Sequence, residues 1–173
     1  MDYRKAYDLV PHSWLLKTLD LTKIAGNVGR LLQNSMSMWQ TELTCNGERL
    51  CDIEIKRGIF QGDSLSPLLF VMPMIPSTFL LRRETFGYKF KGCETLINHL
   101  FFMGDLKLYG KTEKELNELL SIVNKFSNDI GMKFGFEKCA MVVLKAGVRV
   151  RSEGIELPSG DRIKELDEKG YKY

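Results

Sequence analysis

Two aspartates stand where a carboxylate could bind a divalent cation. Asp2 lies at the expected start of a strand, and Asp105 lies at the turn of a hairpin expected over residues 99–110. If the two strands are neighbours in one sheet, both carboxylates converge on one ion. Mg²⁺ is held by one or two carboxylates with water and substrate phosphates, and a pair of such ions can clamp the oxygens of a phosphoryl transfer. Taken alone, an aspartate at a turn is usually there because its side chain bonds nearby backbone amides.

Four helices are expected to position these residues. Hydrophobic periodicity and capping residues predict where each helix lies in the sequence. The helices are expected over residues 13–24, over 27–38, from Ser64 or Ser66 to 84, and over 112–130. Ser13 is the expected N-cap of the first helix. In the third helix Pro67 falls in the tolerated first turn, whereas Pro73 and Pro76 predict a kink. The fourth helix has a capping box of Thr112 and Glu115 and an apolar face.

Strands are expected where apolar and polar residues alternate. Residues 41–58 form two such runs joined at Asn46-Gly47, which predicts a tight hairpin, and residues 99–110 predict a second hairpin around Met-Gly-Asp. Residues 5–10 read as the end of a strand and 139–145 as a buried strand, and a short hairpin with a polar tail follows. The predicted fold class is α+β, with helices packed on one face of an antiparallel sheet.

Composition favours one intracellular domain with an ordinary core. The chain has 173 residues, of which 44% are hydrophobic and 27% charged, and its net charge of +3 permits a polyanionic partner without requiring one. The cysteines form no CxxC pair and have no histidine at ligand spacing, so we expect reduced thiols rather than zinc or disulfides at Cys45, Cys51, Cys93 and Cys139. The longest apolar run is too short and too interrupted by proline to span a bilayer, so no membrane partner is expected and the protein is placed in the nucleus or cytoplasm.

Four separated motifs, in order, resemble the palm motifs of reverse transcriptases of the non-LTR retrotransposon type. They are motif A at 2–11, motif B at 57–70, motif C at 99–110 and motif D at 130–144, and residues 155–173 resemble the start of the primer-grip region. Motif B, RGIFQGDSLSPLLF, is the most specific, because fourteen consecutive positions fit the family pattern. The resemblance implies a single palm-like domain over residues 1–173, without fingers and thumb.

The resemblance assigns catalytic roles to three residues. It implies that Asp2 binds both metal ions and that Asp105 makes a smaller contribution, with Mg²⁺ or Mn²⁺ as the cofactor. Lys138 matches a motif D lysine proposed to protonate the leaving pyrophosphate, although an isolated lysine after a helix also reads as a surface charge. In the same motif Gly135 stands where the family carries asparagine.

The resemblance also assigns binding roles. Tyr7 falls where the family places an aromatic beside the sugar of the incoming nucleotide, with a core aromatic as the alternative. Gln61 and Gly62 lie in the motif B loop that packs against the template–nucleotide pair, where glycine permits close approach of the backbone. Arg57 is a candidate phosphate contact or a solvated arginine. Asp8 is expected to order the turn into the next helix.

Motif C departs from the family at one essential position. The family writes an aromatic, any residue and two aspartates, whereas this chain has Phe102, Met103, Gly104 and Asp105. Gly104 therefore stands at the place of a principal metal ligand. Because two closely spaced cations need carboxylate charge around them, its loss predicts weak metal binding, if any, and impaired polymerisation.

The predicted function is RNA-templated DNA synthesis by two-metal nucleotidyl transfer, impaired at Gly104. The partners would be an RNA or DNA template–primer and deoxynucleoside triphosphates. The alternatives are a retained nucleic-acid-binding module that no longer copies and a vestigial interaction module. The chain is either a fragment of a longer element-encoded protein or a degenerate copy, and the glycine favours the degenerate copy. The sequence does not specify template preference or oligomeric state.

Overall fold

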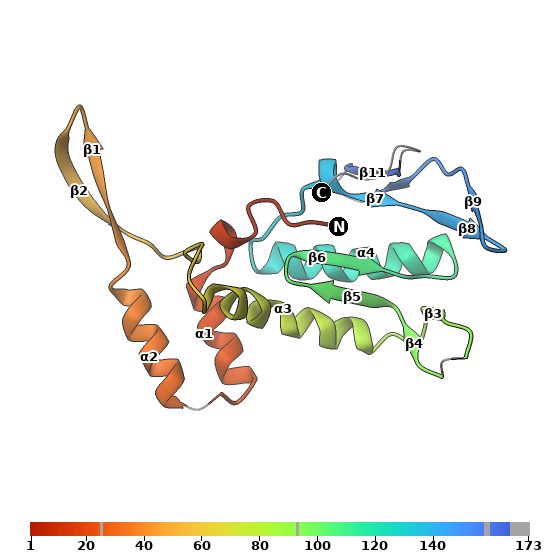
Figure 1. Cartoon of the computed structure of the whole chain (residues 1–173), viewed down its shortest axis with the longest axis horizontal. Helices are drawn as coiled ribbons and strands as arrows, with labels where there is room; N and C mark the ends of the chain where they lie inside the picture. The colour runs from red at the N-terminus through yellow and green to blue at the C-terminus, as the bar shows by residue number, and fades with distance from the viewer. Residues whose placement is uncertain (25, 93, 158–159, 167–173) are drawn as a thin grey trace. The chain divides into compact units, whose positions relative to one another are not determined.

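The computed structural model describes residues 1–24, 26–92, 94–157 and 160–166 (Figure 1). It combines helices with small sheets, which confirms the α+β class in its coarse form. The described strands form four two-stranded sheets and one three-stranded sheet, rather than the single antiparallel sheet that was predicted. The chain divides into two compact units: unit 1 comprises Met1–Arg4 with Ser77–Tyr173, and unit 2 comprises Lys5–Pro76. The division falls inside one helix, between Pro76 and Ser77.

Unit 2 begins with a short 3-10 helix, η1 (Tyr7–Leu9), where the sequence predicted the end of a strand. That prediction was wrong, because the chain turns at Lys5, whose φ is 47° and whose carbonyl accepts hydrogen bonds from the N–H groups of Asp8 and Leu9. The next helix, α1 (His12–Leu21), has Pro11 rather than Ser13 as its N-cap. The carbonyl of Lys56 accepts from the N–H of His12, so a neighbouring segment satisfies this helix end without a side-chain cap.

The remaining elements of unit 2 agree with the sequence. They are α2 (Gly26–Ser37), β1 (Gln40–Cys45), β2 (Glu48–Glu54) and the first part of α3 (Ser66–Arg82). The β1–β2 turn places Asn46 and Gly47 at φ values of 51° and 85°, as a two-residue hairpin turn requires. Both strands of this hairpin are exposed along their whole length. Pro73 and Pro76 lie inside α3, and the kink predicted there remains a prediction.

Unit 1 is built around α4 (Glu113–Asp129) and a hairpin of β5 (His99–Phe102) and β6 (Asp105–Leu108) (Figure 1). The Thr112 side chain caps α4 by accepting from the N–H of Glu115, and the Glu115 carboxylate accepts from the N–H of Lys111. The predicted capping box is confirmed, except that the Glu115 carboxylate accepts from the N–H of Lys111 and not from the N–H of the N-cap residue Thr112. Unit 1 also contains β3 (Tyr88–Lys89) and β4 (Leu96–Ile97), which pair with each other.

The strand predicted over 139–145 is divided in two. It forms β7 (Ala140–Met141) and β8 (Val143–Lys145), because the chain changes pairing partner at Val142. β8 pairs in a hairpin with β9 (Val148–Val150), whereas β7 pairs in parallel with β11 (Arg162–Glu165), which in turn pairs with β10 (Ile155–Glu156). The expectation of a buried strand was wrong for β8, whose Leu144 is 64% exposed.

A hydrophobic cluster joins α4 to these C-terminal strands. Its buried members are Leu120, Cys139, Met141, Ile155, Leu157 and Ile163. Within the described residues no helix has the length and apolar character needed to cross a membrane. Cys93 and residues 167–173, the end of the predicted primer-grip segment, lie outside the described residues, as do residues 158 and 159.

Candidate active site

The segment that carries Asp2 lies between two other pieces of unit 1. On one side, the Met1 nitrogen donates to the carbonyl of Leu106 at 2.7 Å, and the N–H of Leu106 donates to the carbonyl of Met1 at 2.9 Å. On the other side, Tyr3 forms an antiparallel bridge with Phe134. The expected strand at Asp2 is thus reduced to a short segment, but its backbone is hydrogen-bonded on both edges.

This pairing brings Asp2 next to Asp105. A pair of residues that exchanges both backbone bonds is the hydrogen-bonded pair of an antiparallel ladder, which is the arrangement of Met1 and Leu106. In the register set by this pair, Asp105 is the residue opposite Asp2. Residues directly opposite each other in a ladder direct their side chains to the same face. Two carboxylates that are distant in sequence therefore share one surface of unit 1, and both residues are half-buried.

Lys138 completes this group through an ion pair. Its Nζ lies 3.5 Å from Oδ2 of Asp2, with the lysine side chain 59% exposed and the aspartate side chain 34% exposed. Lys138 ends the short 3-10 helix η2 (Phe136–Lys138), and its N–H donates to the carbonyl of Gly135. The N–H of Gly135 donates in turn to the carbonyl of Asp2 at 2.9 Å. The backbone thus holds motifs A and D together beside the carboxylate.

Tyr3 anchors the segment in the core of unit 1. It is 1% exposed, and its ring stacks on that of Phe134 with centroids 4.2 Å apart. Its hydroxyl lies 2.9 Å from Oγ of Ser127, which itself donates to the carbonyl of Val123. Because the serine proton is used in that bond, the tyrosine is the donor to serine. Burial raises the pKa of Tyr3 to about 12, while the Ser127 hydrogen bond acts in the opposite direction.

The turn between β5 and β6 holds Gly104 beside these carboxylates. Phe102 pairs with Asp105, so Met103 and Gly104 form a two-residue loop. The predicted hairpin is confirmed, but Asp105 is the first residue of β6 rather than part of the predicted Met-Gly-Asp turn. Met103 has a φ of 50°, and the side chains of Phe102 and Met103 are exposed. A carboxylate at position 104 would therefore stand directly beside Asp105 at the tip of the hairpin.

The predicted nucleotide-binding residues lie in unit 2. The N–H of Ile59 donates to the carbonyl of Tyr7, and Pro11 forms a bridge with Arg57, so the end of motif A runs beside the start of motif B. Tyr7 is half-buried, and its ring stacks on that of Phe70 at 5.1 Å. This contact shows packing for Tyr7 and leaves its predicted role beside a sugar untested.

The motif B loop exposes its two predicted residues. Gln61 and Gly62 are both exposed, and Gly62 has a φ of 93° with no atom within 4 Å of the place where a Cβ would lie. Its backbone conformation, rather than crowding, therefore favours glycine. Nearby, the Asp63 side chain accepts from the N–H of Leu65 and orders the approach to α3. The predicted residues thus form two groups, one in each unit.

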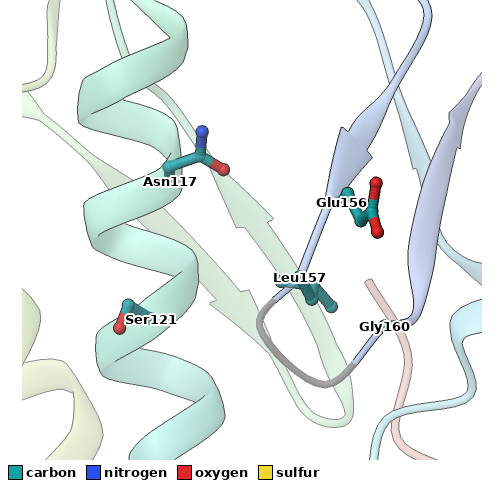
Figure 2. Close-up of a pocket in the computed structure, with 5 residues that line it drawn as sticks. All are labelled: Asn117, Ser121, Glu156, Leu157 and Gly160. Carbon is teal, nitrogen blue, oxygen red and sulfur yellow. The ribbon is translucent and has the colours of Figure 1, made fainter.

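A hollow in unit 1 lies against α4 and the β10–β11 hairpin. Its volume is about 530 Å³, and Figure 2 shows the residues that line it, which are Asn117, Ser121, Glu156, Leu157 and Gly160. None of the predicted site residues borders it. The hollow therefore plays no part in the arrangement around Asp2.

The donor set around Asp2 fits one hydrated cation rather than a closed protein cage. Carboxylates suit Mg²⁺, which keeps several waters and commonly takes one or two carboxylates with substrate phosphates. Within the described ranges no group of three or more His, Cys, Asp or Glu side chains could enclose a metal ion. Asp2 and Asp105 are thus two carboxylates that a partly open site on this face could use.

Sequence reasoning did not single out the residues that fix Asp2. Tyr3 and Ser127 form the buried hydrogen bond, and the segment at Phe134 supplies the bridge. The sequence held one usable signal, because a serine on the apolar face of a helix needs a polar partner. The identity of that partner, 124 residues away, depended on the tertiary fold.

Comparison with known proteins gives consistent matches. The model of the family described as reverse transcriptase (RNA-dependent DNA polymerase) matches residues 1–172. The chain is 28% identical over 159 residues to a retrovirus-related Pol polyprotein from the type-2 retrotransposable element R2DM of Drosophila melanogaster. The aligned region covers 92% of this chain and 15% of that polyprotein. Pol polyproteins from type-1 elements R2 of Popillia japonica and Nasonia vitripennis are 29% and 32% identical, over 94% and 83% of the chain. The chain spans only 14% to 24% of the length of these relatives.

Proposed function

Since this chain belongs to the reverse transcriptase (RNA-dependent DNA polymerase) family, we propose that it is a palm-like domain for RNA-templated DNA synthesis whose catalytic centre is impaired. Its partners would be an RNA or DNA template–primer and deoxynucleoside triphosphates. The whole length of residues 1–173 would form this one domain. The observation that carries the proposal is the pairing of Met1 with Leu106, which makes Asp2 and Asp105 neighbours.

In this proposal Asp2 and Asp105 hold Mg²⁺ or Mn²⁺. The cation would supply Lewis-acid stabilisation of phosphate charge during nucleotidyl transfer. Asp2 is held for this task by its backbone bond to Gly135 and by the buried anchor at Tyr3. Lys138 would give a proton to the leaving pyrophosphate, and the position of its ammonium group beside Asp2 supports this role.

The proposed binding residues act from unit 2. Tyr7 would contact the sugar of the incoming nucleotide, and its stacking on Phe70 would hold the ring in place. The exposed loop at Gln61 and Gly62 would present backbone and amide groups to the template–nucleotide pair. The exposed Arg57 would contact a phosphate, since a guanidinium suits phosphate geometry.

Impairment follows from Gly104. A polymerase centre with two cations needs carboxylate charge between them, and glycine supplies none. If the missing carboxylate slows the chemistry a thousandfold or more, the barrier has risen by about 4 kcal/mol or more. The missing carboxylate at Gly104 also supports a second candidate function, a nucleic-acid-binding module that no longer copies.

Primer extension tests the first proposal. The unchanged chain and Gly104→Asp are assayed on an RNA template with a DNA primer, in Mg²⁺ and in Mn²⁺, with Asp2→Asn as the inactive control. We expect extension by Gly104→Asp to exceed that of the unchanged chain by at least tenfold. Equal, robust extension by both would contradict the role assigned to Gly104, and extension by Asp2→Asn would contradict the role of Asp2.

Template binding tests the second candidate. Affinity for single-stranded RNA is measured over a range of salt concentrations in the unchanged chain and in Arg57→Gln. Phosphate contacts predict affinity that falls with salt, with a shallower slope in the variant. Weak binding that does not change with salt, together with no extension by Gly104→Asp, would leave the vestigial interaction module as the function of this chain.

A further inference from the structure

We infer that Lys138 is a built-in counter-ion of Asp2 that competes with a divalent cation for the same carboxylate. The inference rests on the proposed function in one respect, the binding of a cation by Asp2. It adds a regulatory property to that site: the ammonium group and the cation are alternative partners of Asp2. Metal loading would then free Lys138 for other contacts.

The contact between the two side chains carries the first step. Nζ of Lys138 lies 3.5 Å from Oδ2 of Asp2, within ion-pair distance. The backbone also keeps the two residues close together. The N–H of Gly135 donates to the carbonyl of Asp2, and the carbonyl of Gly135 accepts from the N–H of Lys138. The ammonium group therefore occupies space on the same carboxylate that a cation would use.

Charge gives the second step, because a lysine beside Asp2 balances part of the negative charge on this face. Like charges directly opposite each other in a pair of strands are destabilising, and Asp2 faces Asp105 in this way. Lys138 contributes one positive charge to a face with two carboxylates. In the absence of metal the ammonium group thus reduces the repulsion that the cation would otherwise neutralise.

Exposure determines how strong the competition can be. The lysine side chain is 59% exposed and the aspartate side chain 34% exposed, so water and salt weaken the pair. An ion pair of this kind lowers the affinity of a competing ligand by about two- to fivefold. The contact therefore adjusts metal affinity without blocking the site.

Binding of Mn²⁺ tests the inference, measured from the signal of free Mn²⁺ in electron paramagnetic resonance at low salt. Lys138→Met is compared with the unchanged chain and with Lys133→Met, which removes the same charge from an exposed residue of the neighbouring segment. We expect Lys138→Met to bind Mn²⁺ two- to fivefold more tightly, Lys133→Met to change affinity by less than twofold, and Lys138→Arg to stay close to the unchanged chain. Raising the salt concentration should reduce the difference between Lys138→Met and the unchanged chain.

The outcomes separate the inference from the function on which it rests. If Asp2→Asn abolishes Mn²⁺ binding but Lys138→Met binds no more tightly than Lys133→Met, the counter-ion role is wrong and the metal role of Asp2 stands. If Asp2→Asn leaves Mn²⁺ affinity unchanged, or no variant binds Mn²⁺, both the metal role and the inference are overturned.

Discussion

The hydroxyl of Tyr3 lies 2.9 Å from Oγ of Ser127, so a buried hydrogen bond ties the residue after Asp2 to α4. Segments 124 residues apart are joined at this point, and the ring of Tyr3 also stacks on Phe134. The position of Asp2 therefore depends on the core of unit 1 as well as on its own backbone pairing.

Tyr3→Phe should lower the free energy of unfolding by about 1 kcal/mol. The variant removes the donor to Ser127 but leaves the serine bonded to the carbonyl of Val123, so no buried hydroxyl proton loses its partner. Urea denaturation gives the measurement, and Tyr88→Phe, at an exposed tyrosine, is the control. A loss of stability no larger than that of the control would show that the Tyr3 hydrogen bond contributes nothing.

Stability should fall as the pH rises from 10 toward 12. In the folded chain the pKa of Tyr3 is raised by burial to about 12, whereas an unfolded tyrosine titrates near 10. The folded state therefore keeps its proton where the unfolded state loses it, and this contribution is complete below pH 10 and is lost as the pH passes 12. The expected loss is about 2 to 3 kcal/mol. Urea denaturation in this pH range should show a smaller loss in Tyr3→Phe than in the unchanged chain, and identical pH profiles would contradict the assignment.

Thr112→Ala should destabilise α4. The threonine side chain accepts from the N–H of Glu115 at 3.2 Å, and removal of such a cap costs about 1 kcal/mol. Ser121→Ala is the matched control, because it removes an exposed hydroxyl from the same helix without touching its cap. The difference in unfolding free energy between the two variants measures the cap, and equal values would show that Thr112 does not stabilise the helix.

Local signals explain which parts of the fold the sequence could predict. The α4 cap and the Asn46-Gly47 turn depend on residues within a few positions of one another, and both are confirmed. Apart from the local turn at Lys5 that replaces a predicted strand, the errors lie where a distant segment decides the outcome. The backbone near Lys56 satisfies the start of α1 in place of Ser13, and the change of partner at Val142 divides a strand that looks continuous in sequence.

The same distinction applies to the candidate site. The order of the motifs predicted that Asp2, Asp105 and Lys138 belong to one centre. It did not predict the ion pair between Asp2 and Lys138. That contact depends on the turn through η2, where three residues bring the lysine back toward Asp2. A short turn of this kind has no strong periodicity, so sequence patterns do not reveal it.

Gly58→Ala should destabilise unit 2 by about 2 kcal/mol. Gly58 has a φ of 97°, and a Cβ there would lie 3.1 Å from the carbonyl oxygen of Asp8, so the substitution adds backbone strain and crowding. Its N–H also donates to the carbonyl of Val10, which joins the end of motif A to the start of motif B. Gly29→Ala is the control, because that glycine lies inside α2 with no atom within 4 Å of a new Cβ, and alanine there should stabilise the helix by about 1 kcal/mol. Denaturation of both variants gives opposite signs if these conformations are correct, whereas a stabilising Gly58→Ala would contradict the backbone assigned to this junction.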